Sequence, residues 1–248
     1  VNVTGVIDVR PDARPFCDYR LWAGATLSGT KGRLGLRSIT ITTPKGSETV
    51  PCSALGVSGG WNPNLQLASH HRGKPQWDDG LLAFVPCAGW PSGLIAAGAA
   101  KGHGATAAAL VSGAEAALQA LEQIGIKGTL PAMPETEDRP NGQTAYWHVP
   151  SKRRAWVDFQ NDVTVKDIAL AHQENMPSVE HLKRWTTLGM ATDQGKTSNV
   201  TALAVMAELT GKPIAETGTT IFRPPYTGVA LSVLGGGDTG THFRPTRL

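Results

Sequence analysis

The residues with the clearest chemical potential lie in the string GMATDQGKTS, which runs from residue 189 to residue 198. It combines two glycines, a lysine and hydroxyl side chains, and it stands before an apolar stretch that predicts a helix over residues 199–209. The unpaired N–H groups and the positive dipole end of a helix start favour a phosphate group. Lys196 would add a point charge there. The string therefore predicts contact with a phosphate-bearing ligand.

A nucleotide-hydrolysing phosphate loop is a poor match to this string. Such a loop has the spacing G-x-x-x-x-G-K-[ST] and lies between a strand and a helix. Here one residue too many separates Gly189 from Gly195, and the preceding residues VEHLKRWTTL have a helical pattern. We therefore do not expect nucleotide hydrolysis.

The elements that must position the string form a mainly helical domain over residues 151–212. Capping signals predict three helices. They are Thr164 with Asp167 before residues 165–173, Ser178 before a helix ending near residue 186, and Ser198 before residues 199–209. Gly211 and Pro213 end the third helix.

Residues 1–130 predict an α/β fold. Apolar or alternating runs predict strands over residues 3–9, 36–42, 48–58 and 81–86, and an Ala-rich helix begins near residue 105 and ends at Gly125. Strands followed by a long helix, with glycines at strand ends, are typical of the C-terminal part of a dinucleotide-binding domain of the FAD/NAD(P) type. Gly59, Gly60 and Gly89 are candidate cofactor contacts, because backbone without a Cβ can approach a ligand closely. An ordinary tight turn is the alternative.

The remaining segments predict connections. Residues 131–150 carry four prolines and a local acidic cluster, which is typical of a linker and gives the best domain boundary. Residues 213–248 predict an irregular tail. The chain opens directly on a strand pattern and ends on FRPTRL, so we expect a central fragment of a longer polypeptide.

Composition excludes several classes. The 40% hydrophobic and 17% charged content fits a soluble globular protein, and the net charge of +3 gives no electrostatic case for nucleic acid. No apolar run reaches the length of a membrane-spanning helix. Three widely spaced cysteines suit a reducing compartment, so we expect a cytoplasmic protein. The histidines show no metal-ligand spacing, and no metal site is predicted.

Residues 157–199 resemble a [2Fe–2S] domain of the bacterioferritin-associated-ferredoxin type. Those domains supply two cysteines before a helix start and two more after a Gly-Met pair. The strings VDFQNDVT and GMATDQGKTS keep this frame without the cysteines. The ligand positions hold Asp158, Gln160, Asp193 and Ser198. Because clusters need thiolates or an occasional histidine, we expect no iron–sulfur cluster.

Four strings make the chain similar to a family, the α subunits of heterotetrameric sarcosine oxidase. They are VSGGWNP (57–63), VDFQNDVT (157–164), SVEHLKRWTTLGMATDQGKTSNV (178–200) and TTIFRPPYT (219–227). The family's α subunits are longer, with an upstream G-x-G-x-x-G nucleotide motif and a downstream folate-binding domain that are both absent here.

The resemblance implies an enzyme complex. A β subunit carries FAD that oxidises the amine, an FMN lies between the α and β subunits, and the α subunit holds an NAD without a redox role. Sarcosine would be converted to glycine, formaldehyde or methylene-tetrahydrofolate, and hydrogen peroxide. Further partners would be small subunits, and tetrahydrofolate would bind a domain absent from this chain. The chain itself would carry no catalytic residue and would not be active alone.

The former cluster loop is the candidate FMN contact. Its candidate residues are Thr192, Asp193, Gln194, Gly195, Lys196 and Thr197. Alternatively, these residues keep the loop in its inherited shape or pack against the β subunit. Two other functions remain open: a subunit of a related proline, opine or N-methylglutamate dehydrogenase, and a scaffold that bridges subunits without a cofactor. Arg223 in FRPPYT could reach a cofactor or a partner, or act as a structural anchor.

Overall fold

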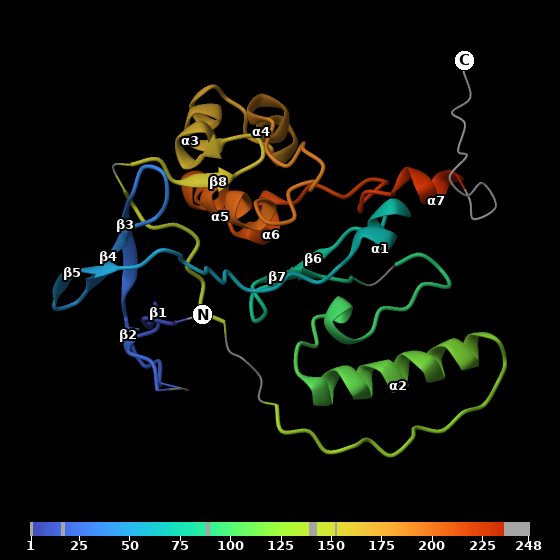
Figure 1. The fold of residues 1–248 in the computed structure, drawn as a ribbon. Helices are drawn as coiled ribbons and strands as arrows, with labels where there is room; N and C mark the ends of the chain where they lie inside the picture. The colour runs from blue at the N-terminus through green and yellow to red at the C-terminus, as the bar shows by residue number, and fades with distance from the viewer. Residues whose placement is uncertain (1, 16–17, 88–89, 139–142, 152, 236–248) are drawn as a thin grey trace.

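The computed structural model describes residues 2–15, 18–87, 90–138, 143–151 and 153–235 (Figure 1). The candidate Gly89 lies outside these residues, as do Cys17 and the last part of the predicted tail. The chain begins with small sheets, continues through a long connection that includes helix α2, and reaches a group of helices.

The first part of the chain is built from two small sheets. Strands β1 (Val6–Asp8) and β2 (Leu21–Ala23) pair in parallel, and β3 (Thr26–Lys31), β4 (Ser38–Thr43) and β5 (Gly46–Pro51) form an antiparallel sheet in that order. The alternating run ITIT turns Ile39 and Ile41 inward. They form a core with Trp22, Ala25 and Val50.

The second part of this region consists of short elements. Helix α1 (Gln66–His70) precedes the antiparallel pair β6 (Gln76–Asp78) and β7 (Ala83–Val85), and a 3-10 turn, η1 (Gly98–Lys101), leads into α2 (Thr106–Gln123). Only Ser112 of α2 is buried, and Figure 1 shows α2 apart from the helical group. The other side chains of α2 are exposed or only partly buried by the described part of the chain.

The helical domain opens with a hairpin of β8 (Trp156–Asp158) and β9 (Val163–Thr164). Its helices are α3 (Val165–Gln173), α4 (Val179–Thr186), α5 (Asn199–Thr210), α6 (Ile214–Thr217) and α7 (Leu231–Gly235). Residues 202–207 of α5 are all buried, so this helix is the centre of a core to which the hairpin, α3 and α4 also contribute. Helix α5 is therefore held firmly at the position that follows the candidate loop.

The α/β class followed by a mainly helical domain is confirmed, and several elements differ from expectation. The strand predicted over residues 48–58 ends at Pro51, because proline has no N–H to continue a ladder. The predicted first strand is only three residues long. The sequence patterns do not predict strands β2, β3, β6, β8 and β9, helix α1, or helices α6 and α7 in the tail. Within the described residues, no helix is long and apolar enough to cross a membrane.

The three predicted helices of the second domain are confirmed, with one local correction. Thr164 and Asp167 form the capping box, and Ser178 accepts a hydrogen bond from the N–H of His181. Ser198 occupies the N-cap position of α5, but its side chain makes no capping bond. The prediction that Ser198 caps through its hydroxyl is wrong, because its backbone is already helical there, unlike the extended backbone of most N-caps.

Removing the carboxylate of Asp167 should weaken α3. Its Oδ2 accepts bonds from both the N–H and the hydroxyl of Thr164, each at 2.7 Å. We expect Asp167→Ala to lower the free energy of unfolding by about 1 kcal/mol, measured by urea denaturation. Lys166→Ala, an exposed change in the same turn, is the matched control. Equal stability of the two variants would contradict this role.

Candidate functional site

The connecting loop, residues 187–198, joins α4 to α5 through an unusual run of left-handed backbone. Thr187 (φ 63°), Gly189 (φ 62°), Gln194 (φ 52°) and Gly195 (φ 75°) all have positive φ. The N–H of Asn199 bonds to the carbonyl of Gly195 at 2.9 Å, which joins the loop to the first turn of α5. The loop is thus a compact structure fixed to the start of a buried helix.

Asp158 ties this loop to the β8–β9 hairpin. Its carboxylate is 2% exposed. Oδ1 accepts the N–H groups of Gln160 (2.8 Å) and Asn161 (3.2 Å), and Oδ2 accepts the N–H of Gly189 (2.8 Å). Asp158 therefore accepts hydrogen bonds from backbone N–H groups of two segments, the hairpin and the loop.

Glycine is required at two places because Asn199 packs against the loop. A Cβ built on Gly189 would stand 2.6 Å from Asn199 Oδ1, and one built on Gly195 would overlap the same side chain. Asn199 Nδ2 donates to the carbonyl of Gln194 at 3.1 Å. The glycines admit the amide that fixes the loop's backbone.

Gln194 connects the loop to the C-terminal strap, which we define as residues 219–227 (TTIFRPPYT). Its Nε2 donates to the carbonyls of Arg223 (2.8 Å) and Pro225 (2.9 Å), and its Oε1 accepts the N–H of Arg223 (2.9 Å). The side chain is 9% exposed. Its amide is therefore committed to the strap, and this geometry makes Gln194 a positioning residue.

Lys196 also lies against the strap, but at the surface. Its ammonium donates to the carbonyl of Tyr226 at 2.8 Å and lies 4.0 Å from the centroid of the Tyr226 ring. Burial raises the pKa of the Tyr226 phenol, so the ring faces Lys196 as a neutral surface. The contact with the ring and the bond to the carbonyl leave other N–H groups of the Lys196 ammonium available. Lys196 can therefore attract an anion.

The other candidate residues of the loop are arranged differently. Thr192 and Thr197 are exposed, and Thr192 Oγ1 lies 3.5 Å from Gln160 Oε1. Asp193 Oδ1 accepts the N–H of Gly195 at 3.3 Å, a contact within the loop itself. Ser198 is 1% exposed, and its Oγ has no hydrogen-bond partner within the described part of the chain.

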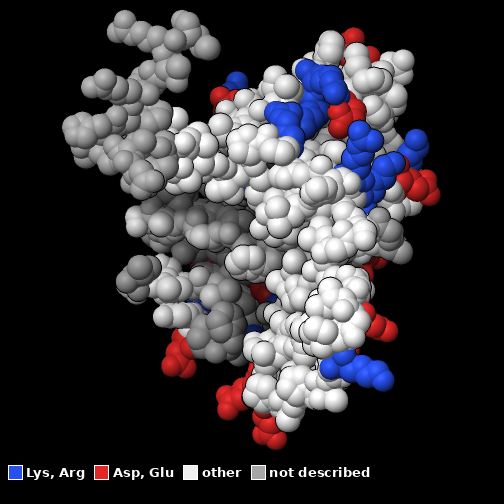
Figure 2. Space-filling view, turned by 90° about the vertical axis from the view of Figure 1, so that its right-hand side faces the viewer, with Lys and Arg blue, Asp and Glu red and all other residues white. Residues whose placement is uncertain are grey.

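Two further basic residues, Lys183 and Arg223, lie on α4 and on the strap. Burial lowers the pKa of Lys183, the charge of Glu180 raises it, and the charges of Arg223 and Arg184 lower it. Figure 2 shows Lys and Arg side chains gathered on the upper part of one face, at the height of the helical domain, with some acidic side chains among them. Sequence reasoning identified Lys196 and Arg223 as candidates. It missed Lys183 and Tyr226, whose only signal was their place in the family-like strings.

The glycines predicted to approach NAD do not belong to the connecting loop or the strap. Gly59 and Gly60 are exposed in the connection between β5 and α1. Gly60 has φ 93°, and a Cβ there would stand 2.8 Å from Gln143 Oε1. Nothing within 4 Å would meet a Cβ on Gly59. Across the described ranges, no group of His, Cys, Asp and Glu side chains could hold a metal ion.

Comparison with known proteins supplies the deciding observations. Residues 152–238 match the family model of the sarcosine oxidase A3 domain. The α chain of sarcosine oxidase from Rhizobium meliloti (strain 1021) is 41% identical over 258 aligned residues, which cover 100% of this chain and 25% of the relative. The chain belongs to the sarcosine oxidase α-subunit family.

Further relatives of this α-subunit family member agree. The α chain of sarcosine oxidase from Corynebacterium sp. (strain P-1) is 40% identical over 78% of this chain and 21% of its own length. One of the subunits of opine oxidase from Rhizobium meliloti is 26% identical over 88% of this chain and 45% of its own. The chain thus spans about a quarter of the sarcosine oxidase α subunits that it matches.

The fold has a counterpart among solved structures. L-proline dehydrogenase from P. horikoshii aligns with a TM-score of 0.64 and 19% sequence identity, over 86% of this chain and 44% of the other. This chain therefore shares its fold with part of that enzyme. The relatives themselves are named as subunits of sarcosine oxidase and of opine oxidase.

Proposed function

We propose that the chain contributes the FMN interface and part of the NAD-binding domain to the α subunit of a multisubunit, flavin-dependent sarcosine oxidase. The complex would demethylate sarcosine oxidatively to glycine, with formaldehyde or methylene-tetrahydrofolate and hydrogen peroxide as the other products. The proposal is supported by 41% identity over the whole chain to the α chain of a sarcosine oxidase. The matched A3 domain, which contains the connecting loop and the strap, supports it further.

The proposed assembly places the remaining chemistry on partners. The β subunit would carry the FAD that accepts electrons from the amine, small subunits would complete the complex, and tetrahydrofolate would bind a part of the α subunit outside this chain. We therefore expect no turnover from the chain alone.

The connecting loop is a suitable seat for the FMN phosphate. Lys196 is an exposed cation braced on Tyr226, and Ser198 Oγ is buried at the start of α5 with no partner among the described residues. Both groups can donate hydrogen bonds to an anion, and the start of α5 favours negative charge. Bound flavin would supply the electron-accepting chemistry. Thr192, Asp193 and Thr197 would meet its polar edge or ribityl chain, while Gln194 would hold the strap and Gly195 would shape the loop.

The proposed NAD contact uses the other part of the chain. Gly59 and Gly60 would let backbone approach the dinucleotide, together with Gly89, which the structure does not describe. The positive φ of Gly60 supports this use, because a side chain there would be strained and would meet Gln143. Replacing Gly60 with valine should therefore reduce NAD content without changing flavin content.

We also propose that the A3 domain binds no iron–sulfur cluster. Both carboxylate oxygens of Asp158 are used by backbone N–H groups, and Asp193 is used within its own loop. Gln160 and Ser198 offer no thiolate. Iron and acid-labile sulfide in the purified complex, in amounts equal to the protein, would refute this.

The decisive test of the flavin seat is Lys196→Met in the complex copurified with the β subunit. The substitution keeps the apolar stem of the side chain and removes the charge. We expect the FMN content to fall at least about fivefold, because one charge-assisted hydrogen bond to phosphate is lost. FMN would be quantified from the visible spectrum after separation from FAD.

Lys212→Met is the matched control, since Lys212 is an exposed residue just beyond the end of α5. It should leave the FMN content unchanged. Full FMN content in Lys196→Met would exclude the loop as the phosphate seat. A colourless complex with the wild-type chain would instead favour a scaffold that bridges subunits.

One alternative substrate class has support of its own. The 26% identity to the opine oxidase relative extends over 88% of the chain, so an opine is the second candidate donor. Oxygen consumption by the copurified complex with sarcosine, proline or an opine as the donor separates these possibilities. Activity with an opine and none with sarcosine would replace the primary proposal.

A further inference from the structure

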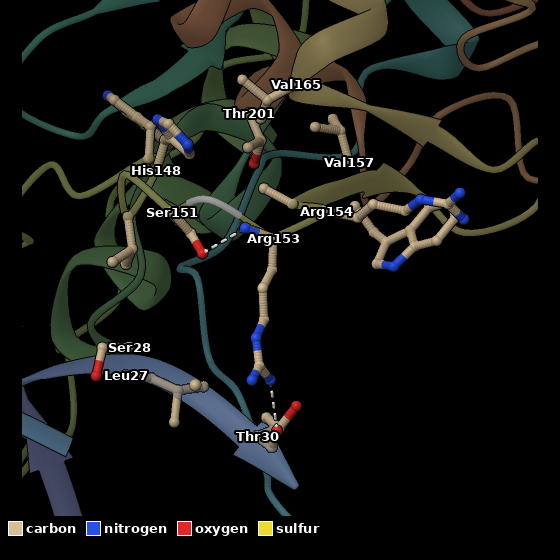
Figure 3. A pocket seen from close by; sticks show the side chains of 15 residues that line it. Leu27, Ser28, Thr30, His148, Ser151, Arg153, Arg154, Val157, Val165 and Thr201 are labelled. Atoms are coloured by element: carbon tan, nitrogen blue, oxygen red, sulfur yellow. Dashed lines mark hydrogen bonds between the residues drawn. The ribbon is translucent and has the colours of Figure 1, made fainter. Parts of the chain in front are cut away.

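A cavity of about 320 Å³ lies between the β3–β4–β5 sheet and the helical domain (Figure 3). Its walls come from residues 27–30 of β3, from residues 147–149, 151 and 153–157, which lead into β8, and from the first turns of α3 and α5. Val165 and Thr201 represent those two helices in the lining. A cavity of this size suits a small organic molecule.

The charged side chains that line this cavity are all positive. Arg153 and Arg154 line it, and no aspartate or glutamate does. Arg153 crosses the cavity toward β3 and donates to the carbonyl of Thr30 at 3.0 Å, as the dashed line in Figure 3 marks. Neither arginine has an ion-pair partner in the part of the chain that the structure describes. The Arg153 guanidinium uses one of its five N–H donors for the Thr30 carbonyl, so other donors are available to bind an oxyanion.

Two helix starts strengthen the positive potential. Val165 is the first residue of α3, and Thr201 lies in the first turn of α5. The N-terminal turns of helices favour negative charge nearby. Asp167, the acidic residue in the first turn of α3, is engaged by Thr164. The helix starts and the arginines therefore favour the same sign of ligand.

The remaining walls are apolar or aromatic. Arg154 lies over the ring of Trp156 at 5.7 Å from the centroid, which fixes the indole as a side wall. Trp147, Val149 and Val157 line the cavity as well. Polar contacts at one side and apolar surface elsewhere are the pattern of a site for an amphipathic small molecule.

We propose that this cavity binds a small organic anion, with a carboxylate or phosphate group held by Arg153 and an apolar or aromatic body against Trp147 and Trp156. Lys196 and the connecting loop do not line it. The site is thus separate from the proposed flavin seat, and it would let an anionic metabolite bind where the two parts of the chain meet.

Isothermal titration of the purified 248-residue chain with AMP and with phenylacetate tests this site. We expect at least one probe to bind, and Arg153→Gln to weaken that binding at least about tenfold, since a charge-assisted bidentate contact is lost. Arg153→Lys, which keeps the charge without the planar fork, should weaken it less. Binding of AMP alone would identify a phosphate, and binding of phenylacetate alone a carboxylate.

Arg184→Gln is the matched control, because Arg184 is an exposed arginine on α4 that does not line the cavity. It should bind the probes as the wild type does. Circular dichroism melting of each variant shows that the fold is retained. The proposal fails if neither probe binds to the folded wild type, or if Arg153→Gln binds as tightly as the wild type.

Discussion

Replacing Asp158 with alanine is expected to lower the free energy of unfolding of the helical domain by about 3 kcal/mol. Three backbone N–H groups, from Gln160, Asn161 and Gly189, donate to this one carboxylate. Asp158 is 2% exposed and its bond to Gly189 is buried, so water could not replace the acceptor of that N–H without opening the domain. Buried donors without partners are the reason for so large a cost.

Urea denaturation followed by far-UV circular dichroism measures this effect. Asp158→Asn keeps the size of the side chain but turns an NH₂ group toward at least one of the N–H donors, so it should fall between the wild type and Asp158→Ala. Lys166→Ala, an exposed change on α3, should remain within about 0.5 kcal/mol of the wild type. A stability of Asp158→Ala close to that of Lys166→Ala would show that the carboxylate does not hold the loop.

The same substitution separates stability from cofactor binding. Asp158 reaches the connecting loop through the N–H of Gly189, 31 residues away in sequence. If the loop seats the flavin phosphate, Asp158→Ala should also reduce the FMN content of the copurified complex at temperatures where the domain is still folded. Lys196→Met should reduce FMN content while lowering stability by less than about 1 kcal/mol, because its contacts with Tyr226 lie at the surface. The two variants therefore distinguish a loop that is misplaced from a loop that lacks its charge.

The helices of the second domain could be predicted closely because their signals are local. Thr164 and Asp167 are three residues apart, and the structure places α3 within the predicted bounds. Strand pairing depends on distant partners, so β2 and β3 could not be recognised from the sequence. The alternating residues of β4 indicated its buried face, but not that β3 would pair with it through a bulge between Leu27 and Gly29.

In the candidate loop, too, local features could be predicted and contacts with distant segments could not. Its glycines and its place before α5 were evident from sequence, and the family followed from strings such as VDFQNDVT. The partners of Asp158 and Gln194 could not be predicted, since they are contacts with segments about 30 residues away. Asp158 had been recognised only as the position of a missing ligand. The structure shows Asp158 as an acceptor for three backbone N–H groups.

Replacing Gln194 with glutamate is expected to release the strap from the loop. The amide of Gln194 both donates and accepts: its Nε2 serves the carbonyls of Arg223 and Pro225, and its Oε1 accepts the N–H of Arg223. A carboxylate could still accept that N–H, but it would face two carbonyl oxygens with no proton to donate. Hydrogen exchange of the Arg223 amide should accelerate about tenfold or more, because each bond of this kind contributes on the order of 1 kcal/mol.

Gln194→Met provides the comparison that identifies the cause. It fills similar volume without donor or acceptor, so it loses the three bonds but adds no repulsion. We expect exchange at Arg223 to be fastest in Gln194→Glu, intermediate in Gln194→Met and slowest in the wild type. Equal protection of Arg223 by glutamate and glutamine would mean that the bonds from Gln194 Nε2 to the two carbonyls contribute nothing. The strap would then be held by the contact of Lys196 with Tyr226. Because the strap also carries Tyr226, on which Lys196 rests, release of the strap should lower FMN content even with Lys196 intact.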